Sequence, residues 1–326
     1  MLPRLVQVAE LQGHSDRIWS IAWSHTGNIL ASCSSDKTIR LWALQKQHGE
    51  KNNDDDLLLH WTCVNVLEGV HNRTIRSVSW SPNGKQLAAA SFDSKTTIWE
   101  KDEETGEGHE NETKSVAWSL AGTLIATCGR DKSVWIWEAS DNDFECLSVL
   151  QEHTQDVKMV VWHPTQELLA SASYDDTIKI WKEDDDDWCC ADTLKGHEST
   201  VWGLDFDKSG DFLGKSIKFK LSDDKTVKFW KTHKKSNESN NNNNPVINPN
   251  STNDIKWKNI CTLSGYHQRC IYSVSWSKIN DRVATGGGDN KIHINCVQWS
   301  PSERFGNLLA SAGDDGVIKI WKFIEE

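Results

Sequence analysis

Histidine, aspartate and a hydroxyl side chain recur together along this chain, and these are the residue types that hydrolases combine for nucleophilic catalysis. A hydroxyl lies four residues before an Asp at Ser32, Thr127, Ser171, Thr285 and Ser311. An active site needs such a set once, whereas this set is repeated. We therefore interpret the repeated group as structural. The His, Asp, hydroxyl and Trp indole of each unit would form hydrogen bonds with one another where they are buried away from water.

The spacing of these residues defines a repeat. An Asp lies six residues before a Trp at Asp36/Trp42, Asp93/Trp99, Asp131/Trp137, Asp175/Trp181, Asp224/Trp230 and Asp315/Trp321. A His opens the units at His14, His71, His109, His153 and His197. A period of about 40 residues with Gly-His near its start and Trp near its end is typical of a WD40 β-propeller, in which each unit is one four-stranded blade. We expect an all-β fold, with an inner strand before each turn Asp and the next strand ending at the Trp.

The organisation of the chain follows from this fold. Residues 1–326 are expected to form a single domain, because each blade buries its faces against two neighbours. The segment Leu5 to Leu11 reads as a strand that pairs with the strand ending at Trp321 and closes the ring. Residues 232–254, which include an Asn run, read as a disordered insertion loop. No apolar run approaches the ~20 residues of a membrane span, so no membrane is expected.

Three units depart from the repeat. The outer strand of the second blade is truncated, because only ten residues separate Trp99 from His109. The fifth unit is too long, with Lys220 at the hydroxyl position, and 214–221 reads as an insertion. The sixth unit has Asn295 at its Trp position, and roughly twenty residues are missing before the inner strand that contains Trp299. We expect a seven-bladed propeller with a defective junction between the sixth and seventh blades, lacking one outer strand and the seventh His.

Charge and cysteine spacing exclude several classes of function. The net charge of −11 argues against direct nucleic-acid binding. The nine Cys show no C-x2-C spacing or neighbouring His, so we expect no metal and no cofactor. Most thiols read as reduced core residues, and four recur in outer strands at Cys63, Cys146, Cys190 and Cys261. An enzyme is the least favoured class, because no nucleophile or carboxylate pair stands apart from the repeat.

Candidate partner-binding residues lie at equivalent positions of the blades, near one end of the central channel. Five residues after each His, at the start of the inner strand, are Trp19, Arg76, Lys114, Lys158, Trp202 and Tyr272. The residues just before the turn Asp include Phe92, Arg130 and Tyr174. Cations and aromatic side chains gathered on one face of an acidic protein predict a socket for an acidic or aromatic peptide segment of a partner.

The residues between these landmarks are more particular than the repeat. Residues 109–118, 126–137, 153–158, 161–164, 170–177 and 196–202 resemble the WD40 subunit of the cytosolic iron-sulfur protein assembly (CIA) targeting complex. This resemblance implies a scaffold that joins a small adaptor subunit and a HEAT-repeat subunit, meets an iron-hydrogenase-like cluster carrier, and serves [4Fe-4S] insertion into client apoproteins in cytoplasm and nucleus. Arg130 matches a surface contact residue of that family.

The alternative is a WD40 adaptor of another kind, such as a ubiquitin-ligase substrate receptor or a histone-binding propeller. Cullin receptors carry Trp-Asp-x-Arg at the end of the strand. Here the Trp is followed by Ala43, Glu100, Glu138, Lys182, Lys231 and Lys322, with no such Arg. The missing Arg disfavours the ubiquitin-ligase interpretation.

Overall fold

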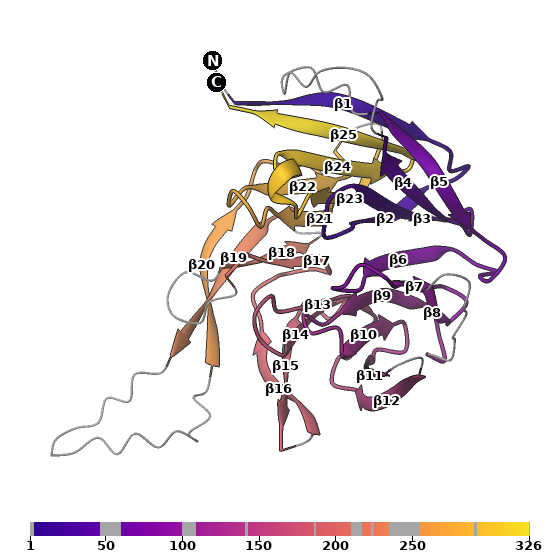
Figure 1. The fold of residues 1–326 in the computed structure, drawn as a ribbon. Helices are drawn as coiled ribbons and strands as arrows, with labels where there is room; N and C mark the ends of the chain where they lie inside the picture. The colour runs from indigo at the N-terminus through magenta and orange to yellow at the C-terminus, as the bar shows by residue number, and fades with distance from the viewer. Residues whose placement is uncertain are drawn as a thin grey trace, which may run out of the picture.

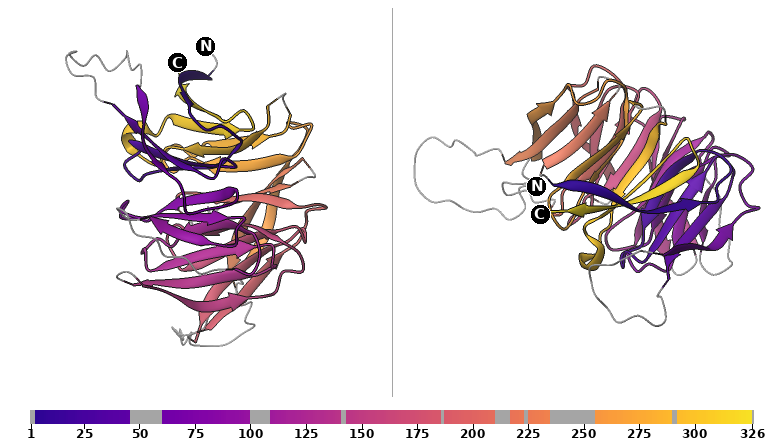
Figure 2. Two further views of the ribbon diagram at one scale, coloured as in Figure 1. Left: turned by 90° about the vertical axis from the view of Figure 1, so that its right-hand side faces the viewer. Right: turned by 90° about the horizontal axis from the view of Figure 1, so that it is seen from above.

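The chain folds into a ring of antiparallel β-sheets, seen in the computed structural model of Figure 1. The structure describes residues 3–45, 60–99, 109–140, 143–185, 187–209, 217–222, 225–234, 255–289 and 292–325. Figure 2 shows the sheets following one another as separate blades. The innermost strands of successive blades contact one another, and the last of them contacts the first, so the ring closes. The prediction of a seven-bladed, all-β WD40 propeller is confirmed.

Five sheets have four strands each, and four of these, in the first, third, fourth and fifth blades, are built from consecutive strands. The first blade contains β2 (Ile18–Trp23), β3 (Ile29–Ser34), β4 (Ile39–Leu44) and β5 (Trp61–Leu67). The third contains β9 (Thr113–Trp118), β10 (Leu124–Gly129), β11 (Val134–Ser140) and β12 (Asp143–Leu150). The fourth contains β13 (Val157–Trp162), β14 (Leu168–Ser173), β15 (Ile178–Asp184) and β16 (Asp187–Leu194). The fifth contains β17 (Val201–Phe206), β18 (Ile217–Ser222), β19 (Val227–Lys234) and β20 (Ile255–Leu263).

The seventh blade is completed by the N-terminus. Its strands are β23 (Ile294–Trp299), β24 (Leu308–Gly313), β25 (Val317–Ile324) and β1 (Arg4–Gln12), with the 3₁₀ turn η1 (Glu303–Phe305) between β23 and β24. Strand β1 pairs antiparallel with β25 from Arg4↔Ile324 to Gln12↔Val317, and the two chain ends meet in Figure 1. This confirms the predicted pairing of the first strand with the last.

Two blades are incomplete in the described part of the chain. The second has three described strands, β6 (Ile75–Trp80), β7 (Leu87–Ser91) and β8 (Thr96–Trp99). The truncated outer strand was predicted within residues 100–108, which lie outside the described residues. The sixth has only β21 (Ile271–Trp276) and β22 (Val283–Gly287). The expectation that this blade lacks a single outer strand was wrong. Just six residues, 288–293, separate β22 from β23, so the sixth blade has lost its third strand as well as its fourth.

Two boundaries also differ from the sequence analysis. Residues 217–222 form β18, the second strand of the fifth blade, and are not part of an insertion. Lys220 pairs with Leu204 at the position where the fourth blade has Ser171, so the assignment of Lys220 to the hydroxyl position holds. Thr232, His233 and Lys234 belong to β19 and not to a loop. The remainder of the predicted disordered loop, 235–254, lies outside the described residues.

The core lies between blades, where apolar side chains of one sheet pack on the next. One cluster joins the first blade to the seventh through Trp42, Trp61, Ala310 and Ile320. The Trp of each repeat faces the preceding blade: Trp181 packs with Ile136 of the third blade, and Trp230 with Ile180 of the fourth. Burial of this large side chain is the main reason why the repeat keeps a Trp at this position.

Candidate functional site: the cation and aromatic array at the channel rim

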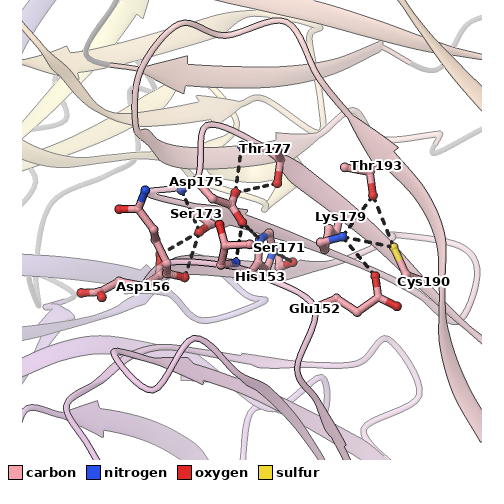
Figure 3. Close-up of polar contacts among 12 residues, drawn as sticks. Glu152, His153, Asp156, Ser171, Ser173, Asp175, Thr177, Lys179, Cys190 and Thr193 are labelled. Carbon is pink, nitrogen blue, oxygen red and sulfur yellow. Dashed lines mark hydrogen bonds and ion pairs between the residues drawn. The ribbon is translucent and has the colours of Figure 1, made fainter.

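The repeated His, Asp and hydroxyl groups form buried hydrogen-bonded sets, illustrated by the fourth blade in Figure 3. His153 Nδ1 donates to Asp175 Oδ2 at 2.7 Å, and the Ser171 hydroxyl donates to His153 Nε2 at 2.7 Å. The same Ser171 oxygen accepts the Trp181 indole N–H at 2.8 Å. The carboxylate also accepts from the hydroxyl of Thr177 at 2.6 Å. Every polar atom of the set therefore has a partner, which buried polar groups require.

The set recurs in the other blades with local variations. His14 and His109 contact Asp36 and Asp131 at 2.8 and 2.6 Å, and Ser32 and Thr127 accept the indoles of Trp42 and Trp137 at 2.9 Å. In the sixth blade His267 contacts Asp289, and its Nε2 lies 2.8 Å from the Thr285 hydroxyl.

The second and fifth blades modify this set. In the second blade His71 contacts Asp93 at 3.0 Å, while the hydroxyl comes from the third strand, where Thr97 contacts both His71 and Trp99. In the fifth blade His197 is buried, but Asp224 lies outside the described residues.

The seventh blade keeps only half of the set. Trp321 donates to Ser311 at 2.8 Å, but His293 Nδ1 lies 3.3 Å from Asp314 and not against Asp315. His293 directly precedes β23, whereas His14 lies four residues before β2, so His293 is displaced along the chain relative to the other blades. The seventh loop His was predicted to be missing. In the structure His293 is present, but it lies too close to its inner strand to take the place of that His.

The His side chains of these sets are closed to solvent. The side chains of His14, His71, His109 and His153 are at most 1% exposed, so no substrate reaches them. Burial alone raises the pKa of Asp93, but the hydrogen bond and charge of His71 outweigh it and lower the pKa to about 2. The same opposing effects of burial and a partner His leave the pKa of Asp36 and Asp175 well below the usual range. Charged carboxylates held in this way stabilise the blade.

The candidate partner-binding residues of the inner strands share one local geometry. Each is the second residue of its strand, and the register of every pairing shifts at that residue, as between Ile18 and Ser20 around Trp19. The same shift occurs around Arg76, Lys114, Lys158, Trp202 and Tyr272. A β-bulge re-aims a side chain out of the alternation of its strand. Because the inner strands form a ring, the six bulges direct these side chains to one end of it.

Most of these side chains touch one another. Lys158 Nζ lies 3.7 Å from the ring centroid of Tyr174 and 4.5 Å from that of Trp202. Ring centroids of Trp202 and Tyr272 are 5.7 Å apart, as are those of Tyr174 and Trp202. On the opposite side of the propeller, the Arg76 guanidinium carbon lies 4.8 Å from the centroid of the Trp19 indole. The result is an array of basic side chains that lie over aromatic rings, which we call the rim array; its residues are Trp19, Arg76, Lys114, Lys158, Tyr174, Trp202 and Tyr272.

Two of the candidates lie beside the rim array, joined through residues that the sequence analysis missed. Arg130 is 60% exposed in its side chain and contacts Glu112 at 3.0 Å. Glu112 also contacts Arg73 at 3.1 Å, and Arg73 lies 5.9 Å from the ring of Phe92. Arg73 and Glu112 belong to the loops that follow the repeat His. Neither lies five residues after a His, so the spacing that identified the bulge residues could not identify them.

Three further neighbours were also missed. Lys114 forms an ion pair with Asp156, and the Tyr272 ring lies 6.0 Å from that of His293. Asn295, expected at the Trp position of the sixth blade, is the bulge residue of β23 and the seventh member of this series. Its amide donates to the Ile18 carbonyl at 3.0 Å and to Asp314 at 2.9 Å. Asn295 lies two residues after His293 and not five, so the spacing rule of the repeat could not find it.

The charge state of Lys158 is set by its neighbours. Burial between two aromatic rings, together with the positive charges of Lys114 and Arg76, lowers the pKa of Lys158 to about 6. Desolvation of the charged form is the largest contribution, as expected for a partly buried ammonium group. The rim array therefore contains a lysine that would take up a proton from solvent when an arriving carboxylate stabilises its charged form.

Cys63, Cys146, Cys190 and Cys261 lie in the outer strands β5, β12, β16 and β20, as expected. The expectation that most thiols are core residues was wrong, because only Cys33 and Cys128 are buried. Cys63, Cys146 and Cys261 are exposed and not core residues. In three blades the outer-strand Cys pairs with the repeat Trp beside a bulge, as Cys63↔Trp42, Cys146↔Trp137 and Cys190↔Trp181. Each thiol lies near the carbonyl two residues ahead, at 3.5 Å for Cys63 and Cys190. Cys therefore recurs at this position because its thiol can form a hydrogen bond to a carbonyl across the bulge. Figure 3 shows the neighbouring contact of Lys179 with Glu152 and Thr193 in the fourth blade.

Among the described residues, no group of three or more His, Cys, Asp or Glu side chains is arranged to hold a metal ion. No helix in the described part of the chain is long and apolar enough to span a membrane.

Comparison with known proteins identifies the class and then the family. The WD domain, G-beta repeat family matches residues 5–43, 61–100, 102–138, 144–182, 188–231, 257–294 and 291–322, so the chain is a WD40-repeat propeller. Probable cytosolic iron-sulfur protein assembly protein Ciao1 of Culex quinquefasciatus is 44% identical over 97% of both chains. Protein CIA1 of Arabidopsis thaliana is 44% identical over 98% of this chain and 96% of its own length. The probable CIAO1 homologue of Caenorhabditis elegans is 36% identical over 98% and 99%. The chain belongs to this CIAO1/CIA1 family of WD40 proteins.

Proposed function

We propose that this protein is a non-catalytic scaffold of cytosolic iron-sulfur protein assembly, acting in the cytoplasm and the nucleus. Relatives that match nearly its whole length are named for that process. The buried His, Asp and hydroxyl sets hold the blades and are out of reach of a substrate. A closed ring of this kind is suited to presenting a rigid surface to several partners at once. The partners proposed are a small adaptor subunit, a HEAT-repeat subunit, an iron-hydrogenase-like cluster carrier and client apoproteins.

The observation that supports a docking role best is the rim array. Lys158 lies over the rings of Tyr174 and Trp202, which meet edge to face, in a protein whose net charge is −11. Aromatic rings and guanidinium groups are the residue types that dominate binding energy at interfaces. An acidic or aromatic segment of a partner would find basic side chains and ring faces that are already ordered by β-bulges, so little side-chain entropy is lost on binding. We assign the rim array and Arg130 to partner docking.

Affinity for an acidic partner segment is expected to increase as the pH falls from 8 toward 6. The pKa of Lys158 in the free protein is about 6, and a nearby carboxylate raises it in the complex. Between the two pKa values binding takes up a proton, so the complex gains stability as the pH falls through that window and reaches a plateau below pH ~6. Calorimetry with the purified adaptor subunit, in buffers of different ionisation enthalpy, measures the proton uptake.

The control for this experiment is Lys158→Met, which removes the titrating group while keeping a long apolar side chain. Its affinity should not depend on pH in the same range. If the wild-type protein takes up no proton, Lys158 does not meet a carboxylate, and the rim array is not a socket for acidic segments.

The purified protein is expected to bind no iron-sulfur cluster tightly. Cluster ligation needs several thiolates within reach of one cluster, and Cys63, Cys146 and Cys261 lie in outer strands of different blades. Anaerobic reconstitution with iron and sulfide, followed by desalting, should leave no stoichiometric iron and no cluster absorption. A bound [4Fe-4S] spectrum would contradict the scaffold proposal.

A pull-down from cell extract distinguishes this proposal from the alternative. Stable recovery of the adaptor and HEAT-repeat subunits supports the assembly scaffold. Recovery of cullin-ligase subunits or histones in their place would support a WD40 adaptor of the other kind.

A further inference from the structure

The incomplete sixth blade leaves an open strand edge. In the described part of the chain β22 pairs with β21 alone, whereas the equivalent strand of the first blade, β3, pairs on both sides. There, Leu30 pairs with Trp23 on one side and with Trp42 of the third strand on the other. Val283 pairs with Trp276 in the same manner but has no third strand beside it. Val283 is 37% exposed, so the edge is accessible to solvent. Free backbone groups on such an edge can pair with another strand.

Apolar walls flank this edge on both sides. On the fifth blade, Val227 and Phe229 pack against the sixth, and their partners Leu263 and Cys261 share that face. Leu263 is 39% exposed and Phe229 is half-buried. On the seventh blade, Trp321 and Phe323 face the sixth and are also half-buried. By contrast Trp42 and Trp181, which face complete blades, are 3% and 1% exposed. The missing strands thus leave apolar surface uncovered on both neighbours.

The side chains around this edge indicate which kind of strand can pair with it. In the fourth blade the hydroxyl of Ser171 accepts the indole N–H of Trp181 while it contacts His153. Thr285 occupies the same position in the sixth blade and contacts His267, but the blade has no such Trp. Lys231 and its cross-strand partner Lys258 lie on the same face of the fifth blade as Phe229. They lie beyond the level at which a third strand of the sixth blade would carry its Trp. A strand that ends in Trp and continues with acidic residues would match the hydroxyl and the positive charge.

We propose that an extended segment of a partner protein adds to β22 as the third strand of the sixth blade. Its apolar side chains cover the fifth and seventh blades, its Trp lies opposite Val283 and donates to Thr285, and acidic residues follow the Trp. Main-chain pairing at a sheet edge provides affinity in this mode of recognition, and alternate side chains provide specificity. This surface is separate from the rim array, so the inference does not depend on the proposed docking role of Lys158 or Arg130.

The test uses a peptide of the required pattern taken from the chain itself. Residues 175–184 (DDTIKIWKED) form the third strand of the fourth blade with its flanking acids. Fluorescein-labelled peptide is titrated with the full-length protein, and anisotropy is recorded. We expect saturable binding that weakens by at least about tenfold when the peptide carries Trp181→Ala. The same loss is expected when the protein carries Leu263→Asp, which places a charge on the uncovered face.

Leu147→Asp is the matched control, because Leu147 is 49% exposed on the outer strand β12 of the third blade. This variant should bind the peptide as the wild type does. The absence of saturable binding, or equal binding by the Leu263→Asp and wild-type proteins, overturns the proposal. Light scattering of the protein alone gives the remaining outcome. A dimer that the peptide dissociates would show that a second copy of this chain covers the edge, and this also overturns the proposed partner segment.

Discussion

A protein that lacks residues 1–12 is expected to melt at least about 6 °C below the full-length protein and to aggregate on heating. The deletion removes β1, which pairs with β25 along its whole length. Leu11 is 3% exposed in the core between the seventh and first blades, and Val8 and Ala9 pack against the same cluster. Loss of one fully buried Leu costs about 1.5–3 kcal/mol before any backbone pairing is counted.

The deletion also exposes β25 as a free edge, and aggregation follows from unpaired backbone groups there. A control deletion of residues 1–3, which precede β1, should leave the melting temperature unchanged. Differential scanning fluorimetry and light scattering measure both effects. Equal melting of the 1–12 deletion and the full-length protein would mean that the ring closes without its first strand.

Asp131→Ala is expected to destabilise the fold by about 3 kcal/mol. The carboxylate accepts from His109 Nδ1 at 2.6 Å and from the Ser133 hydroxyl at 2.5 Å. The His109 side chain is 0% exposed, so the variant leaves a buried ring nitrogen without its acceptor. Removal of one partner from a buried pair costs more than the pair contributes, because the remaining group can find no water.

Asp131→Asn is the informative control, since its amide oxygen can still accept from His109. It should recover most of the lost stability in a urea titration. Equal stability of the alanine variant and the wild type would show that the repeated sets do not hold the blades.

The sequence was sufficient to predict the parts of the fold that repeat. The spacing of Asp and Trp located the turn and third strand of each complete blade, and the apolar segment around Val6 and Val8 was assigned correctly to the closing strand. The offset from His found Lys158 and its equivalents, because a β-bulge recurs at the same place in every inner strand. These features recur at fixed spacings along the chain, so the sequence alone is enough to locate them.

What the sequence could not predict depends on contacts between distant segments. Asn295 occupies a bulge of the seventh blade because the chain has too few residues to finish the sixth. In the second blade, Ala89 leaves His71 without the usual hydroxyl, and Thr97 from the next strand replaces it. The link from Arg130 to Phe92 through Glu112 and Arg73 joins two blades. No fixed spacing encodes such pairs.

The most direct test of the docking role is the affinity of the purified adaptor subunit for Arg130→Glu. Arg130 is exposed and its loss leaves no buried group unpaired, so the variant should melt like the wild type. Lys85→Glu makes the same charge change in the exposed turn between β6 and β7 and serves as the control. We expect about thirtyfold weaker binding for Arg130→Glu and wild-type binding for Lys85→Glu. Normal binding of the adaptor, the carrier and a client apoprotein by Arg130→Glu would contradict the assignment of this surface to partner docking.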